Sequence, residues 1–186
     1  MNVSKNNFIL VLLLGILILL MIAIVGLFIQ MNRLQSEIIT VFKAQIPGNG
    51  LDINTMAPDF SLTNLLGKKI SLTDFKGHKV LLVFASTTCP HCIDMFPHLK
   101  IFADRSSNIQ VVLVLNGSVE DDQKLVQTQG YSFPVLIWDE AIAQDYKIPG
   151  TPFFYSIDEK GVIKSLGNAI TEDQIAKLVQ TVDNKY

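Results

Sequence analysis

The sequence predicts an α/β fold: a three-layer sandwich in which a mixed β-sheet carries helices on both faces, preceded by one N-terminal transmembrane helix. After residue 50, apolar segments typical of strands alternate with helical patterns, which indicates a partly parallel sheet covered by helices. Residues 158–161 form a turn pattern between two strand-like segments, so these two strands should be antiparallel. Residues 8–29 carry no charged residue and no proline, and at helical rise they are long enough to cross a bilayer.

The chain divides into four predicted parts. Residues 1–7 form a short cytoplasmic N-terminus, 8–29 the transmembrane anchor, 30–50 a juxtamembrane stalk or linker, and 51–186 one folded domain. The stalk ends in a proline–glycine cluster at 47–50, which is typical of a domain boundary. A cleaved signal peptide is the competing interpretation of the apolar segment. Its apolar core normally spans only ~7–15 residues, so the length favours a retained anchor.

Within the domain, the strands and helices follow from the spacing of apolar residues and from the turn residues between them. Pro97 lies inside the helix that follows the cysteines and should kink it. Thr171 and Gln174 have the spacing of a capping box, which marks the start of the last helix. The expected elements, in order, are a hairpin around 67–69, a strand at 79–85, a helix to about 105, a strand at 111–115, a helix at 118–130, a short strand at 133–137, a short helix at 139–146, strands at 151–157 and 162–166, and a helix from 171 to about 182.

The candidate active site is the segment Cys89-Pro90-His91-Cys92, which holds the only two cysteines of the chain. It lies between an apolar strand and a helix, the context that distinguishes a redox dithiol from a zinc site. A zinc site would need two further ligands, and the remaining histidines, His78 and His98, show no paired spacing. We therefore expect no metal and no cofactor in this site.

The position of the two cysteines at the start of a helix predicts their roles. Unpaired backbone N–H groups and the positive end of the helix dipole stabilise a thiolate at Cys89, which makes it the nucleophile. Cys92, one turn later, can resolve a mixed disulfide by forming a disulfide with Cys89. A purely structural disulfide is disfavoured because so short a loop closes little chain entropy. Pro90 and His91 should tune the redox chemistry, His91 by donating a hydrogen bond or by carrying positive charge close to Cys89.

The composition and the dithiol together limit the partners and the location. The chain carries a formal net charge of −2 at pH 7 and no basic patch interleaved with aromatic residues, which argues against nucleic acid as a partner. Stable protein disulfides are found mainly outside the cytosol. We therefore expect the domain on the extracytoplasmic face of a bacterial cytoplasmic membrane. It should contact the lipid bilayer through residues 8–29 and act on protein thiols and disulfides.

Several motifs carry a resemblance to a known family: Ala57-Pro58-Asp59-Phe60, Leu72-Thr73-Asp74-Phe75-Lys76-Gly77, the dithiol itself, Phe96-Pro97, and Ile148-Pro149-Gly150-Thr151-Pro152. Over roughly residues 54–184 the chain resembles the thioredoxin superfamily and, within it, membrane-anchored thiol–disulfide oxidoreductases of the ResA/TlpA type. The resemblance implies that Pro152 is a cis-proline facing the dithiol, and that the backbone of Thr151 binds a substrate strand by edge pairing. From the residues alone, a trans proline at the start of a strand would be the interpretation. The resemblance also implies a membrane-bound redox partner.

The chain departs from that family at positions where its members carry an acid. Met95 stands where ResA-like reductases of cytochrome c maturation carry a glutamate, and Val83 stands where thioredoxins have a buried acid. The acid that would assist proton transfer from Cys92 is therefore missing. Around the first cysteine the sequence is similar to MauD-type accessory proteins, and Pro90-His91 is similar to the dipeptide of the oxidant DsbA. These local features predict an oxidising couple, in an oxidant or assembly factor. A ResA/TlpA-like reductant of protein disulfides is the alternative.

Two other classes of protein compete with this interpretation. A peroxiredoxin shares the opening at 57–60, but Leu82 replaces its active-site proline, and Arg105 is the only arginine of the domain that could hold the peroxidatic thiolate. A copper-binding module of the Sco type would use both thiolates and a histidine, because soft sulfur ligands suit Cu(I). That family, however, spaces its cysteines by three residues rather than two.

Overall fold

The computed structural model describes residues 12–28, 30 and 50–180 of the chain. It falls into two units, Met1–Ile46 and Pro47–Tyr186, each of which is described by itself. The predicted cytoplasmic N-terminus, the two ends of the predicted anchor (8–11 and 29) and nearly all of the predicted stalk lie outside the described residues. In the first unit, residues 12–28 are helical and their apolar side chains are exposed. Among the helices that are described, none combines the length and the apolar character of a membrane span.

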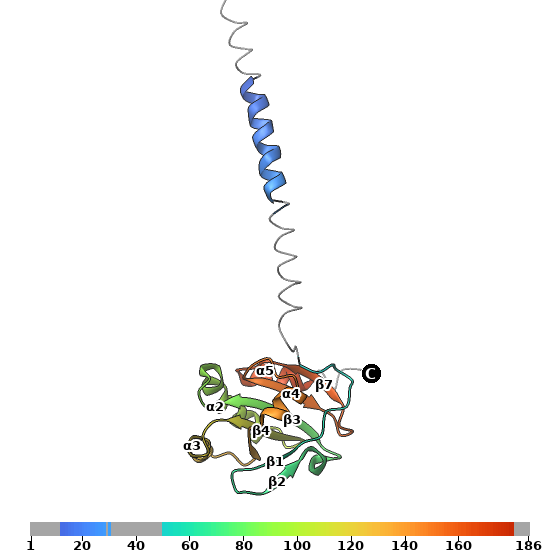
Figure 1. The fold of residues 1–186 in the computed structure, drawn as a ribbon, viewed down its shortest axis with the longest axis vertical. Helices are drawn as coiled ribbons and strands as arrows, with labels where there is room; N and C mark the ends of the chain where they lie inside the picture. Colours follow the sequence, from blue (N-terminus) through green and yellow to red (C-terminus); the bar gives the residue numbers. More distant parts are fainter. Residues whose placement is uncertain (1–11, 29, 31–49, 181–186) are drawn as a thin grey trace, which may run out of the picture. The chain divides into compact units, whose positions relative to one another are not determined.

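The second unit is built on a mixed sheet of five strands in the order β5-β4-β3-β6-β7. Figure 1 labels β3, β4 and β7 of this sheet. The pairs β3–β4 and β4–β5 are parallel, whereas β3–β6 and β6–β7 are antiparallel. This confirms the predicted mixed sheet and the antiparallel pair joined by the turn at 158–161. The strands are β3 (Lys79–Ser86), β4 (Ile109–Asn116), β5 (Val135–Ile137), β6 (Phe153–Ile157) and β7 (Ile163–Gly167).

The two strands at the centre of the sheet are the apolar runs that the sequence shows. Residues 80–85 of β3 and 111–115 of β4 are all buried, the pattern of strands covered on both faces. They pair in register, with Leu82 opposite Val112. The strand β3 leads into the short turn before Cys89, so the burial of this strand holds that turn in place.

Helices cover both faces of the sheet, as the sequence predicts. On one face, Leu99 of α2 and Ile175 of α5 pack in one buried cluster with Val83 of β3. On the other face, Ile142 of α4 packs in a second cluster with Phe84. The helices are α2 (Pro90–Arg105), α3 (Val119–Gln129), α4 (Glu140–Asp145) and α5 (Glu172–Gln180).

The ends of the helices follow local signals. The capping box at α5 is confirmed, because the Gln174 side chain accepts a hydrogen bond from the Thr171 N–H (3.2 Å) and the Gln174 N–H donates to the Thr171 hydroxyl (3.4 Å). The helix α3 ends at Gly130, whose φ of 63° is the left-handed conformation that favours glycine. The helix α2 continues through Pro97 as one α-helix.

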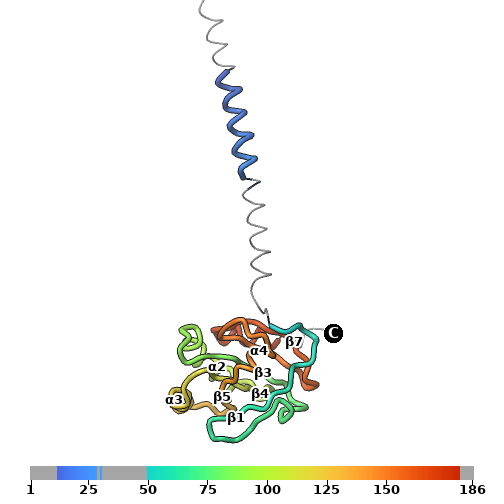
Figure 2. The backbone as a smooth tube through the Cα atoms, viewed as in Figure 1, coloured from blue at the N-terminus to red at the C-terminus, as the bar shows by residue number. Residues whose placement is uncertain are grey.

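A short hairpin precedes the sheet, and Figure 2 shows the chain running from it towards β3. Its strands, β1 (Ser61–Thr63) and β2 (Lys69–Ser71), pair antiparallel and confirm the predicted hairpin. The following segment, expected as a turn, is a 3₁₀-helix, η1 (Leu72–Phe75).

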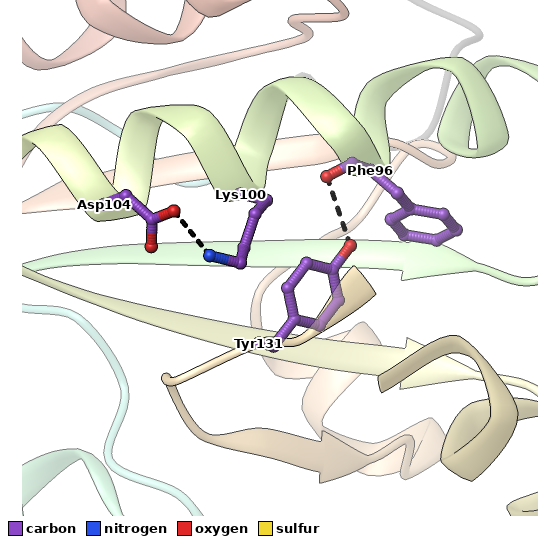
Figure 3. Close-up of polar contacts among 4 residues, drawn as sticks. All are labelled: Phe96, Lys100, Asp104 and Tyr131. Atoms are coloured by element: carbon purple, nitrogen blue, oxygen red, sulfur yellow. Dashed lines mark hydrogen bonds and ion pairs between the residues drawn. The ribbon is translucent and has the colours of Figure 1, made fainter. Parts of the chain in front are cut away.

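The helix that carries the dithiol is tied to the segment after α3. The Tyr131 hydroxyl donates a hydrogen bond to the Phe96 carbonyl, 3.2 Å away (Figure 3). On the same helix, Lys100 pairs with Asp104 one turn later. Burial raises the pKa of Tyr131, so its hydroxyl stays protonated and remains a donor over the physiological range. The helix α2 is therefore held against two layers, the sheet below it and the α3–β5 connection beside it.

Candidate active site

The dithiol follows the short turn at 87–88 that connects the end of β3 to the start of α2. Cys89 is the N-cap of α2, with an extended backbone (φ −86°, ψ 119°), and Pro90 is the first helical residue. Proline suits that position because its fixed φ is helical and its missing N–H would have no partner there. The backbone N–H groups of His91 and Cys92 in the first turn act on the Cys89 sulfur, and the Cys92 N–H also donates to the Cys89 carbonyl (3.0 Å).

The environment of Cys89 favours its thiolate. Burial raises the pKa of this thiol, but hydrogen bonds from the thiol and backbone of Cys92, from the side chain of Thr151 and from the backbone of His91 outweigh that effect and hold the pKa below its ordinary value. Two of these donors are N–H groups of the first helical turn, as the sequence predicts. The side chain is half-buried and is thus open to a partner.

The environment of Cys92 opposes its thiolate. Its side chain is fully buried in the same cluster as Val83 and Met95. Burial first, and then the hydrogen bond and the charge of Cys89, raise the pKa of Cys92 to about 11. The Ser86 N–H, 3.5 Å from the Cys92 sulfur, offsets part of this shift. Val83 and Met95, the positions at which the resembling families carry an acid, are thus apolar and buried in the same cluster as Cys92.

The peptide bond between Thr151 and Pro152 is cis, which confirms what the resemblance implied. The Cys89 thiol donates a hydrogen bond to the Thr151 carbonyl, 3.2 Å from its sulfur. The Asn168 side-chain amide donates to the Pro152 carbonyl (2.6 Å), so the loop is fixed from the β7 side as well. The structure therefore brings the dithiol together with Thr151 and Pro152, which lie some sixty residues away in the sequence.

The turn from β3 into the dithiol is a part of the site that sequence reasoning missed. The Ser86 hydroxyl contacts the Thr88 hydroxyl (3.0 Å) and accepts from the Thr88 N–H (3.3 Å), while the Ser86 carbonyl accepts from the Cys89 N–H (3.3 Å). Three hydroxyl residues in a row, at 86–88, are a signal for such a turn, because their side chains bond to nearby backbone groups.

The other residues considered in the sequence occupy different places. Pro90 and His91 are exposed, and the group of His91 that acts on Cys89 is its backbone N–H; tuning by the imidazole stays a prediction. Arg105 lies at the far end of α2 and pairs with Glu172 (2.7 Å), away from the dithiol. Over residues 12–28, 30 and 50–180, no three His, Cys, Asp or Glu side chains gather in an arrangement that could hold a metal ion.

An open groove of about 560 Å³ adjoins the segment that leads to the cis-proline. Its walls come from the end of β4, from Trp138, from α4 and from the segment that leads to the cis-proline. Trp138 is held by its indole N–H, which donates to Glu140 (3.1 Å). Because Thr151 lines the groove and also contacts Cys89, a bound chain would lie across both.

Comparisons with known proteins agree with this geometry. The AhpC/TSA family matches the chain over residues 53–166. The thioredoxin-like protein YneN of Bacillus subtilis is 39% identical over 122 residues, covering 63% of this chain and 72% of that protein. The methylamine utilization protein MauD of Paracoccus versutus is 27% identical over 169 residues, covering 88% and 85%. The thiol-disulfide oxidoreductase ResA of Bacillus cereus is 30% identical over 138 residues, covering 71% and 79%.

Solved structures are similar in fold. The thioredoxin domain of a thiol-disulfide oxidoreductase from Bacteroides vulgatus superposes with a TM-score of 0.61 at 22% identity, over 69% of this chain and 99% of that one. A secreted disulfide oxidoreductase of Mycobacterium tuberculosis superposes with a TM-score of 0.59 at 22% identity, over 68% and 96%. Both similarities confirm the thioredoxin-like fold.

Proposed function

We infer that this chain, which belongs to the AhpC/TSA family and is a thiol–disulfide oxidoreductase, exchanges disulfides with protein substrates through Cys89 and Cys92. The observation that carries the inference is the opposite environment of the two sulfurs. Cys89 is half-exposed with a lowered pKa, whereas Cys92 is buried with a raised one. A dithiol that divides in this way has one attacking sulfur and one resolving sulfur.

The exchange proceeds in two steps. The Cys89 thiolate attacks one sulfur of a substrate disulfide, forms a mixed disulfide and releases the other substrate sulfur as a thiolate, which takes up a proton. Cys92 then loses its proton and attacks Cys89, which forms the Cys89–Cys92 disulfide and releases the second substrate thiol. The substrate disulfide is reduced by two electrons and the dithiol is oxidised by two. Both cysteines are free thiols in this structure, and the same steps run in reverse when the protein acts as an oxidant.

The substrate binds as an extended chain across the cis-proline loop. The backbone of Thr151 offers edge pairing, and the groove beside it takes the residues that flank the substrate cysteine. Capture of the mixed disulfide tests the assignment. In a Cys92→Ala variant, Cys89 should remain covalently bound to substrate proteins, while a Cys89→Ala variant should capture none. Capture through Cys92 alone would reverse the roles.

We propose that the couple is comparatively oxidising. Donor groups of the first helical turn stabilise the Cys89 thiolate, and Val83 brings no opposing charge. We further predict that the His91 imidazole adds a donor next to the site. A stabilised thiolate makes the reduced protein more stable and its partners easier to oxidise. Equilibration with glutathione tests this, and His91→Ala should shift the equilibrium towards the oxidised protein. A potential near that of thioredoxin, ~−270 mV, would favour the alternative, a reductant supplied by a membrane-bound electron carrier.

We also propose that residues 8–29 anchor the domain on the extracytoplasmic face of a bacterial cytoplasmic membrane, where a membrane-bound redox partner renews the dithiol. The uncharged apolar run supports the anchor, and the need of a dithiol for disulfide-bearing substrates supports the orientation. Protease added to intact spheroplasts should digest the domain. Digestion only after lysis of the membrane would place the domain on the cytoplasmic side.

A further inference from the structure

Asp122 is a fully buried carboxyl group that the exchange reaction does not use. Its residue is 0% exposed, and neither carboxyl oxygen has a hydrogen-bond partner among the described residues. It lies in the first turn of α3, where the exposed Glu120 and Asp121 already place acidic charge at the helix start. Burial of an unpaired carboxyl group costs stability that an apolar side chain would not cost. Stability of the helix therefore does not account for Asp122.

The Asp122 carboxyl group lies close to Thr87, in the turn between β3 and the dithiol. The Thr87 hydroxyl is the other buried side-chain oxygen that lacks a partner in the described part of the chain. A side-chain carbon at Gly117 would lie 2.3 Å from Asp122 Oδ1 and 2.4 Å from Thr87 Oγ1, so both oxygens border the space that this glycine leaves open. A hydroxyl group and a carboxyl group are complementary as donor and acceptor. The two unpartnered groups thus face the same point in the fold.

Thr87 belongs to the turn on which both sulfurs depend. Its backbone N–H donates to the Asn116 carbonyl (3.2 Å), which fixes the turn to the end of β4. The residue before it, Ser86, donates its N–H to the Cys92 sulfur and accepts from the Cys89 N–H. A displacement of Thr87 would therefore move its neighbour Ser86, which contacts both Cys89 and Cys92.

We propose that Asp122 is a positioning residue for the dithiol: the structure does not itself show a bond between its carboxyl group and the Thr87 hydroxyl, but such a bond across the space beside Gly117 would satisfy both buried groups and fix the turn that presents Cys89. The proposal rests on the proposed function, since it concerns the same dithiol. The charge of Asp122 is not among the causes of the pKa shift of either cysteine. In this proposal Asp122 acts through the geometry of the turn.

Five variants of the full-length protein in detergent separate positioning from simple stability. Asp122→Leu and Thr87→Val remove the polar group, Asp122→Asn and Thr87→Ser keep one, and Glu120→Gln removes a neighbouring exposed charge. Two quantities are measured: the pH midpoint of thiolate absorbance and the equilibrium constant with glutathione. The first two variants should raise the Cys89 midpoint and shift the equilibrium towards oxidised protein by about threefold to tenfold, the range of one lost hydrogen bond. The other three should match the unmodified protein.

A double variant completes the test. Asp122→Leu combined with Thr87→Val should shift the equilibrium no further than the larger single change, because both remove the same contact. Additive shifts would show that the two side chains act separately and would overturn the proposal. A lower thermal stability with a native thiolate midpoint and a native equilibrium constant would show that Asp122 is only structural.

If the polar-to-apolar variants fail to fold, Gly117→Ala decides the question. Its backbone is outside the left-handed region, so alanine can adopt the backbone conformation, but the added methyl group would lie only 2.3 Å and 2.4 Å from the two oxygens and must push them apart without removing either. It should reproduce the shift, and a native equilibrium constant would overturn the proposal. If the unmodified protein does not exchange with glutathione at all, the proposed function itself fails, which is a distinct result.

Discussion

Brief treatment of the reduced protein with iodoacetamide should modify Cys89 and spare Cys92. Burial, followed by the hydrogen bond and charge of Cys89, raises the pKa of Cys92 to about 11 from the ordinary 9.0. At pH 7 only about one Cys92 side chain in ~10⁴ is then a thiolate, ~100-fold fewer than for an unshifted thiol. Because Cys92 is also 0% exposed, access to the reagent lowers its rate further.

The assay is peptide mapping by mass spectrometry after a short, quenched reaction over a series of pH values. Alkylation of Cys89 should rise with a midpoint below that of a free thiol, since its pKa is lowered. The same reaction in guanidinium chloride is the matched control, because unfolding removes both shifts and should make the two cysteines equally reactive. Comparable rates for Cys89 and Cys92 in the folded protein would refute the division into attacking and resolving sulfurs.

Three further predictions concern stability, each measured by urea unfolding. Burial, and then the charge of Asp121, raises the pKa of Asp122 to about 6 from 3.8. The folded protein therefore binds the carboxyl proton of Asp122 more tightly than the unfolded chain does, and it loses stability as the pH rises from about 4 to 6. Asp122→Asn should thus add up to roughly 3 kcal/mol at pH 7 and little at pH 3.5; an equal gain at both pH values would exclude burial of the charge as the cause. Leu99→Ala, at a fully buried position of α2, should cost about 2–5 kcal/mol, and a loss below 1 kcal/mol would contradict the packing described. Thr171→Ala should cost about 1 kcal/mol through loss of the α5 cap, and no change would show that the cap bonds add nothing.

The features that the sequence predicts correctly are those set by local chemistry. The dithiol at the start of a helix, the strand before it and the capping box at Thr171 each depend on residues within one or two turns of each other. Central strands are recognisable because burial on both faces requires continuous apolar runs. The differences are correspondingly small: η1 replaces an expected turn, and several element ends move by one or two residues.

The cis bond at Pro152 marks the limit of local reasoning. From its own neighbours, Pro152 would be a trans proline at the start of a strand, and only the family resemblance indicated the bond that the structure shows. The contact of the preceding residue, Thr151, with Cys89 arises from the antiparallel pairing of β3 with β6, which brings the start of β6 to the end of β3. No short-range pattern contains that pairing, because it joins segments that are distant in the chain.

Asp122 shows most clearly what only the tertiary structure decided. In the sequence it is the third of three acids at the start of a helix, a pattern explained by the helix dipole. Its spacing from Leu125 and Val126 places it on the inward helix face, but that spacing does not reveal what it meets there. The neighbours, Thr87 and Gly117, come from two other connections at the same edge of the sheet. Local propensity determined the elements and the reacting sulfurs, whereas the packing of three separate segments decided the surroundings that tune them, because burial and the distance between residues remote in sequence exist only in the folded chain.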